Sequence, residues 1–514
     1  MTTATITQRL QPRGATVLGV IAALGAAGVM GLVATLTNSP LALLAGGVLA
    51  LGTAMLFRPE LGVILFLALL WMNVPAVLVT FHHVPGFVVE ASILLLLVPV
   101  AKYLLQRQPV VITPASIALL IYVGANLLSS ATSTNPALAT QSVVTLLGEG
   151  LLIYALASNA IRSPRVAQYA VRTLVVAAVV MAALAIHQEV TQSYDDPYLG
   201  FARIKDQAEI ITGIPNPDDR PRSEGPVGET NRFAQVLLVV VPLALTGMGI
   251  RHALLGRVLP AAASLVIATG VLLTFSRGAA VAMGLLAVVL VLKRYVKLRH
   301  MLAVILAFMV SVFAVAPEFI ARVESIGAVA GWVSGDSDAP DGAVLGRTTS
   351  NVAALLVFVD HPIAGVGPGV YAQDYSIEYA NRLGLRFFLE ERRAHNMYVE
   401  WAAELGIIGL TSGLAMIALT MTQLSGLRNY WLTRRRDYAD LAGAFWLAVL
   451  MYASTAVFLH LSYARYFFGL LALANSVIWV LQQERKSLGN EAPAAQLPNG
   501  ALEAIPAGAY RLPT

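Results

Sequence analysis

The chain has 514 residues, of which 57% are hydrophobic and only 12% are charged. Soluble domains carry about 25% charged residues, so the composition indicates an integral membrane protein. The chain has no cysteine, which excludes disulfides, thiolate metal sites and thiol catalysis. Its net charge of +5 is better explained by basic loops that set membrane topology than by an acidic partner, and we expect no nucleic-acid partner.

Apolar runs of about 20 residues recur along the chain, each long enough to cross a bilayer as a helix. Backbone groups in lipid must be bonded internally, and the alternation of a barrel is missing, so we predict an all-α, polytopic membrane helix bundle. The first run lacks a cleavage signal and is predicted to be a retained span. About fourteen transmembrane helices are predicted, near 15–36, 40–57, 61–80, 87–106, 114–131, 142–160, 166–190, 232–250, 254–275, 278–293, 300–316, 404–424, 440–460 and 463–482.

Lysine and arginine accumulate in alternate short loops, for example at Arg58, at Arg162 with Arg165, and in the run 434–436. Because cytoplasmic loops carry this excess, both termini are predicted to be cytoplasmic. The loops 191–231 and 317–403, and the turn that holds Arg277, then lie on the extracytoplasmic side.

Six regions follow from this assignment. Residues 1–190 form N-terminal transmembrane helices, 191–231 a first extracytoplasmic loop, 232–316 helices with the Arg277 turn, 317–403 a large extracytoplasmic loop, 404–486 the C-terminal helices and 487–514 a disordered cytoplasmic tail. The large loop is too long for a passive connection. It is predicted to contain short helices at 348–359 and near 371–384.

Two arginines in these outer segments are predicted to bind an anion. Arg277 lies on the side where positive charge is disfavoured, so we interpret it as functional rather than topological or snorkelling. Its guanidinium can bind phosphate oxygens bidentately. Arg347 precedes the helix predicted from about 348, whose N-terminus adds a positive dipole end. Taken alone, it is better explained as a solvated loop arginine.

His395 lies where the large loop re-enters the membrane. An unperturbed pKa of about 6.5 suits a general base, and the alternative is a histidine bonded to a loop carbonyl. Glu400 and Glu404 lie one turn apart near the membrane surface; they orient His395, bind sugar hydroxyls or cap the helix start. The glycine run 365–369 lacks the ending of a nucleotide-binding loop, and no cofactor is expected.

Three further segments accompany the histidine stretch Arg393-Ala-His-Asn-Met-Tyr-Val-Glu-Trp-Ala-Ala-Glu-Leu-Gly-Ile-Ile-Gly409. They are Phe275-Ser-Arg-Gly278; Gly346-Arg347 leading to Asp360-His-Pro-Ile-Ala-Gly-Val-Gly-Pro-Gly-Val-Tyr371; and Arg222-Ser-Glu-Gly225 leading to Asn231-Arg-Phe-Ala234. Together they resemble the core of the O-antigen ligase and polymerase family, over roughly residues 220 to 425.

The resemblance implies a metal-independent, inverting glycan transfer from undecaprenyl diphosphate to an acceptor hydroxyl, on the periplasmic side of the bacterial inner membrane. Arg277 and Arg347 would hold the diphosphate and His395 would activate the acceptor. Further implied substrate-binding residues are Arg222, Tyr398, Glu400 and Glu404. The implied partners are an undecaprenyl-diphosphate-linked glycan donor, a glycan or lipid acceptor, and membrane lipids.

Two departures leave the branch of the family open. The tryptophan that often follows the loop arginine is absent, since Asn351 and Val352 occupy that region, and fourteen spans exceed the expected twelve. A ligase to a lipid core, a repeat-unit polymerase that extends an O-antigen or exopolysaccharide, and a protein glycosyltransferase all remain open. A polysaccharide or lipid transporter is the alternative of another class, but it should place its site at the membrane midplane. A structural scaffold would not need these polar residues.

Overall fold

The computed structural model describes residues 50–205, 221–247, 255–299, 342–384, 390–461 and 463–491, with a few isolated positions between 302 and 310. The predicted span 15–36, most of the spans 40–57 and 300–316, the loop 317–341 and the tail beyond 491 lie outside the described residues.

The described chain is almost entirely helical, which confirms the predicted all-α class. Its first half contains α3 (Glu60–Trp71), α4 (Val74–His82), α5 (Val88–Ala91), the 3-10 helix η1 (Ser92–Leu96), α6 (Leu97–Leu105), α7 (Pro114–Ala131), α8 (Pro136–Thr145), the π-helix η2 (Leu146–Leu152), α9 (Ile153–Ala160), α10 (Pro164–Thr191), η3 (Tyr198–Gly200), β1 (Arg203–Lys205) and β2 (Arg222–Gly225). Its second half contains α12 (Thr230–Pro242), the π-helix η4 (Leu243–Gly247), α13 (Leu255–Leu272), α14 (Arg277–Leu292), α17 (Gly342–Asp360), the π-helix η5 (Tyr371–Tyr375), α18 (Ser376–Arg382), α19 (Met397–Trp431), α20 (Arg436–Thr455) and α21 (Ala464–Glu491). The strands β1 and β2 form an antiparallel pair.

Seven helical segments of the described chain are long and apolar enough to cross a membrane. The pair α3 and α4, bent by 52° at Met72 and Asn73, makes an eighth if it is one span. The predicted number of fourteen is not confirmed. Two predicted spans correspond to shorter apolar helices, Val258–Leu272 and Arg277–Leu292.

The helix starts follow from local sequence. Thr113 precedes Pro114 and forms a capping box with Ser116, in which each side chain bonds the other residue's backbone N–H. Ser163 caps α10 by accepting a hydrogen bond from the Val166 N–H. Asn396 does the same for α19, and this cap fixes where the chain turns into the helix directly after His395.

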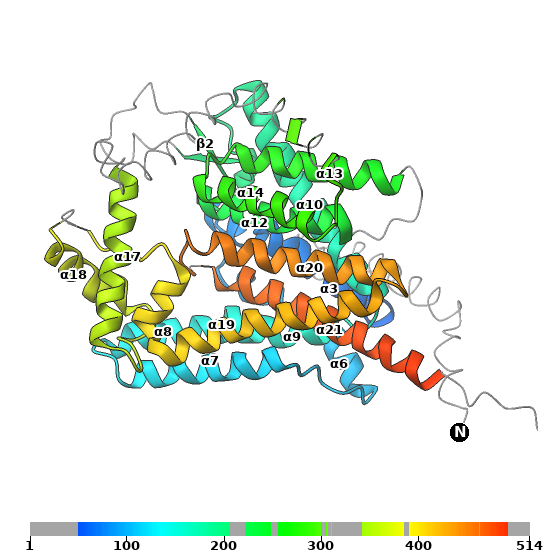
Figure 1. The fold of residues 1–514 in the computed structure, drawn as a ribbon, viewed down its shortest axis with the longest axis horizontal. Coiled ribbons are helices and arrows are strands. Elements are labelled where there is room, and N and C mark those ends of the chain that lie inside the picture. The colour runs from blue at the N-terminus through cyan, green and yellow to red at the C-terminus, as the bar shows by residue number, and fades with distance from the viewer. Residues whose placement is uncertain are drawn as a thin grey trace, which may run out of the picture.

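The long helices run side by side, and α17 stands across one end of the bundle with α18 outside it (Figure 1). From the α17 end, α19 runs to Trp431 and the basic turn 434–436, and α20 returns to bring Ala456 against Met397, whose N–H donates to the Ala456 carbonyl at 2.9 Å. The described part of the large loop and this basic turn therefore lie at opposite ends of the bundle.

The described part of the large loop docks on the bundle through a small core of its own. Val357 of α17, Tyr371 of η5 and Ala380 of α18 are buried together with Ala403 of α19. The helix predicted at 371–384 is present as η5 and α18. The helix predicted at 348–359 is also present, but α17 begins by Gly342, so Arg347 lies inside it. The prediction that Arg347 precedes a helix N-terminus is wrong, and the dipole argument made for it does not apply.

Candidate functional site

The turn after α17 supplies hydrogen-bond partners to backbone groups of α19 at a break in that helix. Gly406 has φ 63° and ψ −162°, which interrupts the helical hydrogen bonds of α19 two turns from its start. The turn 362–367 supplies substitute backbone partners: Val366 N–H to Ala403 O at 3.1 Å, Gly367 N–H to Glu404 O at 3.0 Å, and Ile407 N–H to Pro362 O at 2.8 Å. The glycines of this motif thus allow two backbones to approach closely.

An ion pair between a half-buried arginine and a buried glutamate fixes the backbone on one side of His395. The Arg393 guanidinium pairs with Glu400, whose carboxylate also accepts the Ala394 N–H at 3.3 Å. On the other side, the Asn396 cap holds the start of α19. His395 itself has φ 54°, a left-handed conformation that persists in a non-glycine residue only where its neighbours impose it. Glu400 therefore serves to position the histidine loop.

The surroundings of His395 are strongly cationic. Burial, together with the positive charges of Arg347, Arg392, Arg393 and Arg232, lowers the pKa of His395 to about 4. The imidazole is therefore neutral near pH 7 and able to accept a proton. Arg347 comes from α17 and Arg232 from α12, so elements distant in sequence meet at this histidine.

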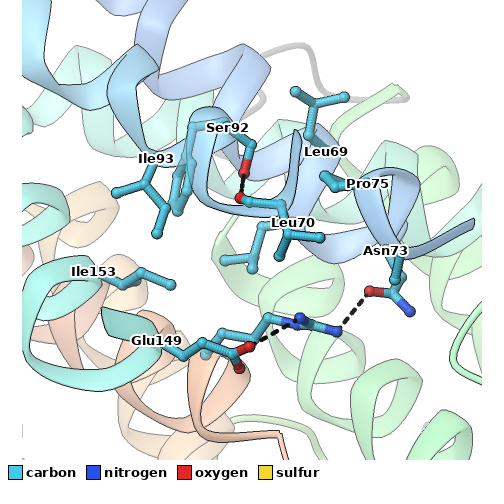
Figure 2. Close-up of a pocket in the computed structure, with 12 residues that line it drawn as sticks. Leu69, Leu70, Asn73, Pro75, Ser92, Ile93, Glu149 and Ile153 are labelled. Atoms are coloured by element: carbon cyan, nitrogen blue, oxygen red, sulfur yellow. Dashed lines mark hydrogen bonds and ion pairs between the residues drawn. The ribbon is translucent and has the colours of Figure 1, made fainter. Parts of the chain in front are cut away.

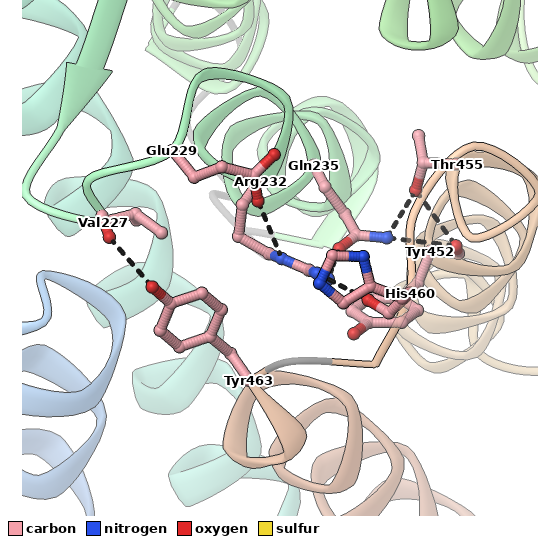
Figure 3. A network of polar contacts seen from close by, with 8 residues as sticks. All are labelled: Val227, Glu229, Arg232, Gln235, Tyr452, Thr455, His460 and Tyr463. Atoms are coloured by element: carbon pink, nitrogen blue, oxygen red, sulfur yellow. Dashed lines mark hydrogen bonds and ion pairs between the residues drawn. The ribbon is translucent and has the colours of Figure 1, made fainter. Parts of the chain in front are cut away.

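A second histidine packs against the first. The rings of His395 and His460 have centroids 5.3 Å apart and planes inclined at 70°. His460 lies in the connection between α20 and α21. The backbone carbonyl of His460 accepts a hydrogen bond from Arg232 (Figure 3).

Arg232 is held by a network of its own. Its side chain is 1% exposed, its Nη1 donates to Gln235 Oε1 at 3.0 Å, and its Nε lies 3.6 Å from the Glu229 carboxylate. Gln235 in turn donates to the Thr455 hydroxyl at 2.8 Å. Figure 3 shows this chain of contacts joining α12 to the end of α20.

Arg222 anchors the turn that leads to Arg277. Its buried guanidinium donates from Nε to the Thr274 carbonyl at 3.1 Å and from Nη2 to the Thr230 hydroxyl at 3.1 Å. Arg277 is the first residue of α14 and is half-buried. The neighbouring Gly278 packs against the ring of Phe458, two residues before His460. The start of α14 and the histidine region therefore share one end of the bundle.

The other two predicted site residues make contacts within the fold. The Tyr398 hydroxyl donates to the Ala453 carbonyl at 2.7 Å. Glu404 is buried, and its backbone carbonyl accepts from the Ser129 hydroxyl at 2.6 Å as well as from Gly367. These contacts tie the first turns of α19 to α7, α20 and the large loop.

A separate polar contact lies between the bend that joins α3 to α4, the π-helix η2 and α21. Arg465 donates to Asn73 Oδ1 at 2.9 Å and lies 3.5 Å from the Glu149 carboxylate (Figure 2). The adjoining cavity, lined mainly by apolar side chains, has a volume of about 20 Å³. That is room for a single water molecule and not for a sugar, so we interpret this contact as structural.

Sequence reasoning missed His460 and the role of Arg232. His460 is an ionisable residue at the edge of a predicted span on the outer side, the same signal that singled out Arg277. Arg232 lies within the segment Asn231-Arg-Phe-Ala234, for which the sequence indicated no role of this arginine. In the part of the chain that the structure describes, no cluster of three or more metal-ligating side chains occurs.

Residues 262–414 match the family model described as O-antigen ligase. The matched segment runs from α13 into α19 and includes Arg277, Arg347 and His395, whereas Arg222, Arg232 and His460 lie outside it. No curated protein matches the chain. The match confirms the family resemblance that the sequence motifs indicate.

Proposed function

We propose that this membrane protein belongs to the O-antigen ligase family and transfers a glycan from undecaprenyl diphosphate to an acceptor hydroxyl on the periplasmic side of the bacterial inner membrane. The observation that carries the proposal is the environment of His395. His395 lies among four arginines whose positive charges, together with burial, lower its pKa, and three of them belong to the segments that bear the family motifs. A histidine surrounded by arginines suits a general base that acts next to a bound anion such as a diphosphate.

The arginines suit the donor's diphosphate. Guanidinium groups stay charged at every physiological pH and bind phosphate oxygens through paired N–H donors. We propose that Arg347 and Arg277 hold the diphosphate, with Arg392 as a third cation at the same site. Positive charge placed there also stabilises the negative charge that grows on the leaving group, the role that a divalent ion has in other transferases. The proposed transfer is therefore metal-independent.

The transfer itself is a displacement at the sugar's anomeric carbon. The acceptor oxygen forms a bond to that carbon while its proton moves to an imidazole nitrogen of His395. The bond between the carbon and the diphosphate oxygen breaks, and its electron pair leaves with undecaprenyl diphosphate. Attack from the face opposite the leaving group inverts the configuration.

Binding of the donor should also activate the base. The arginines lower the pKa of His395 because they repel an added proton. A bound diphosphate cancels part of this positive field, so the pKa of His395 rises and the imidazole becomes a stronger base. Acceptor activation is thus coupled to the presence of the donor.

The position of the site supports transferase over transporter. His395 directly precedes α19 at the α17 end of the bundle, opposite the basic turn after α19, whereas a transporter site is expected near the membrane midplane. We propose that the α17 end faces the periplasm and that the termini are cytoplasmic.

The test is transfer by the purified protein in liposomes, with a lipid-diphosphate glycan donor carrying a labelled sugar. His395→Ala should abolish transfer, while donor binding stays near the wild-type level because the base acts on the acceptor. His82→Ala is the matched control, since His82 is exposed and remote in sequence from the four family segments. Full transfer by the His395→Ala protein would overturn the assignment.

The choice of acceptor separates the family branches. The same assay should be run with a lipid-core acceptor and, in parallel, with the donor lipid as the only glycan present. We propose the ligase reaction, so label should move to the lipid core. Lengthening of the donor-linked glycan would instead indicate a repeat-unit polymerase.

A further inference from the structure

His460 has a buried ring nitrogen that calls for an explanation. Its Nδ1 is shielded from solvent and has no hydrogen-bond partner among the described residues. Leaving a buried polar atom unpaired is costly, and a catalytic role is one of the explanations for such an atom in a native structure. The ring that packs against it belongs to His395.

The fold holds the backbone that carries this ring from two directions. Arg232 binds the His460 backbone carbonyl and is itself fixed by Gln235 and Glu229 (Figure 3). The Met397 N–H, two residues after His395, binds the Ala456 carbonyl of the same connection. The two histidine segments are therefore linked by backbone as well as by their rings.

The charged groups around His460 keep it neutral. Burial comes first, and the positive charges of Arg393 and Arg232 add to it, so the pKa of His460 lies far below its ordinary value. A proton on His395 acts in the same direction. The ring of Tyr463 also lies against Arg232, with 5.6 Å between the guanidinium carbon and the ring centroid. His460 is thus a hydrogen-bond acceptor that does not compete for the proton.

We propose that His460 is a positioning residue of the transfer reaction, whose Nδ1 accepts a hydrogen bond from the imidazolium that forms on His395 and which Arg232 holds in place. This inference rests on the proposed function. In the resting structure the rings meet edge to face, and the hydrogen bond forms once both nitrogens of His395 carry protons. His460 takes up no proton: the proton from the acceptor hydroxyl stays on His395 until product leaves, and then passes to water.

The role answers a physical difficulty of the site. Four arginines oppose a positive charge on His395, yet the reaction must place one there. A neutral acceptor beside the ring stabilises that charge without adding a cation. Hydrogen bonds to charged groups are the stronger kind, so the effect on the pKa of His395 should be about one unit.

Two substitutions separate a proton-accepting role from packing. His460→Phe keeps an aromatic ring but removes the nitrogen, whereas His460→Gln keeps an acceptor oxygen. His82→Phe is the control at an exposed histidine. We expect His460→Phe to lower kcat about tenfold or more with donor binding unchanged, and His460→Gln to retain a substantial part of the activity.

The second readout needs no substrate. The chain has 8 histidines, so labelled imidazole signals can be resolved by NMR in nanodiscs and assigned by substitution. The pKa of His395 should fall by about one unit in the His460→Phe protein and stay near its wild-type value in His460→Gln.

The outcomes are distinguishable. An unchanged His395 pKa in His460→Phe, or wild-type kcat for that protein, overturns the inference while leaving the transferase proposal intact. A wild-type protein that shows the coupled titration but no glycan transfer overturns the proposed function and leaves the histidine pair standing. Loss of folding in His460→Phe is detected by size-exclusion chromatography, and the inference then depends on whether His460→Gln preserves the pKa of His395.

Discussion

Substitution of Gly406 by alanine should dislodge the large loop from the bundle. Gly406 adopts φ 63° with an extended ψ, a conformation that L-residues rarely reach. A Cβ atom built there would overlap the Ile363 carbonyl oxygen, which is backbone and cannot rotate away. The substituted chain must therefore move either α19 or the turn 362–367.

The size of the effect follows from what is lost. Backbone strain at such a position costs about 1–3 kcal/mol. The three backbone hydrogen bonds between the turn 362–367 and α19 contribute about 0.5–1.5 kcal/mol each. We expect Gly406→Ala to destabilise this docking by about 3–7 kcal/mol, a large share of the roughly 5–15 kcal/mol that stabilises a typical protein. Because Arg347 is carried by α17, transfer activity should fall as well.

The assay is thermal unfolding of the purified protein in detergent, combined with limited proteolysis within 361–384. Gly124→Ala is the matched control. Gly124 lies in α7, which packs against α19, and a Cβ there meets nothing within 4 Å. Its replacement should leave Tm unchanged or raise it, since alanine is favoured over glycine in a helix by about 0.5–1 kcal/mol. A Gly406→Ala protein with wild-type Tm, protease resistance and activity would refute the docking argument.

Three further predictions concern charge and orientation. Arg347→Gln removes a positive neighbour, so the pKa of His395 should rise from about 4 and the acid limb of kcat/KM should move to higher pH; an unmoved limb would separate Arg347 from the base. Arg277→Lys should restore little of the activity lost in Arg277→Ala, because lysine lacks the planar guanidinium that binds two phosphate oxygens at once. If both substituted proteins were as active as wild type, diphosphate binding by Arg277 would be excluded. Since the chain has no cysteine, a cysteine at Gln373 should react with an impermeant thiol reagent in intact spheroplasts and one at Ser487 only after lysis; the reverse pattern would place the site in the cytoplasm.

The helical membrane fold could be predicted from the sequence because lipid leaves few choices. Apolar length and the need for internal backbone hydrogen bonds are read directly from composition and run length. The number and the ends of the transmembrane helices could not be predicted as well, because short breaks within a helix leave no mark in the hydropathy of the sequence. The bend at Asn73 divides one predicted span into two helices, and the π-helix η2 joins α8 and α9 into one segment that starts earlier than predicted.

The start of α17 was predicted too late in the chain because of the local sequence. The helix was predicted to begin only at about 348, and the preceding residues include Gly342 and Gly346, which are poor helix formers. The buried packing of Val357 and Tyr371 against α19 stabilises the helix that contains these glycines. Tertiary contacts of this kind outweigh propensity, and no short window of sequence reveals them.

Only some of the residues around His395 could be predicted from the sequence. Arg393 and Glu400 lie within one motif, so their proximity to the histidine follows from spacing. Arg232 comes from α12 and His460 from the connection between α20 and α21, 163 residues before and 65 residues after His395 by their numbering. A single sequence shows that they are ionisable groups near span edges, but it cannot show that they converge.

On the proposed mechanism, this convergence sets the order of events. The arginines that attract the donor are the charges that weaken His395 as a base. Without a diphosphate, an acceptor hydroxyl therefore meets an imidazole with little tendency to take its proton. Once the diphosphate has bound, its negative charge offsets the positive charge of the arginines. The pKa of His395 then rises, and the imidazole becomes a stronger base beside the sugar that receives the acceptor. Removing arginines one at a time should thus strengthen the base while weakening donor binding, two opposite effects that a site built only for binding would not couple.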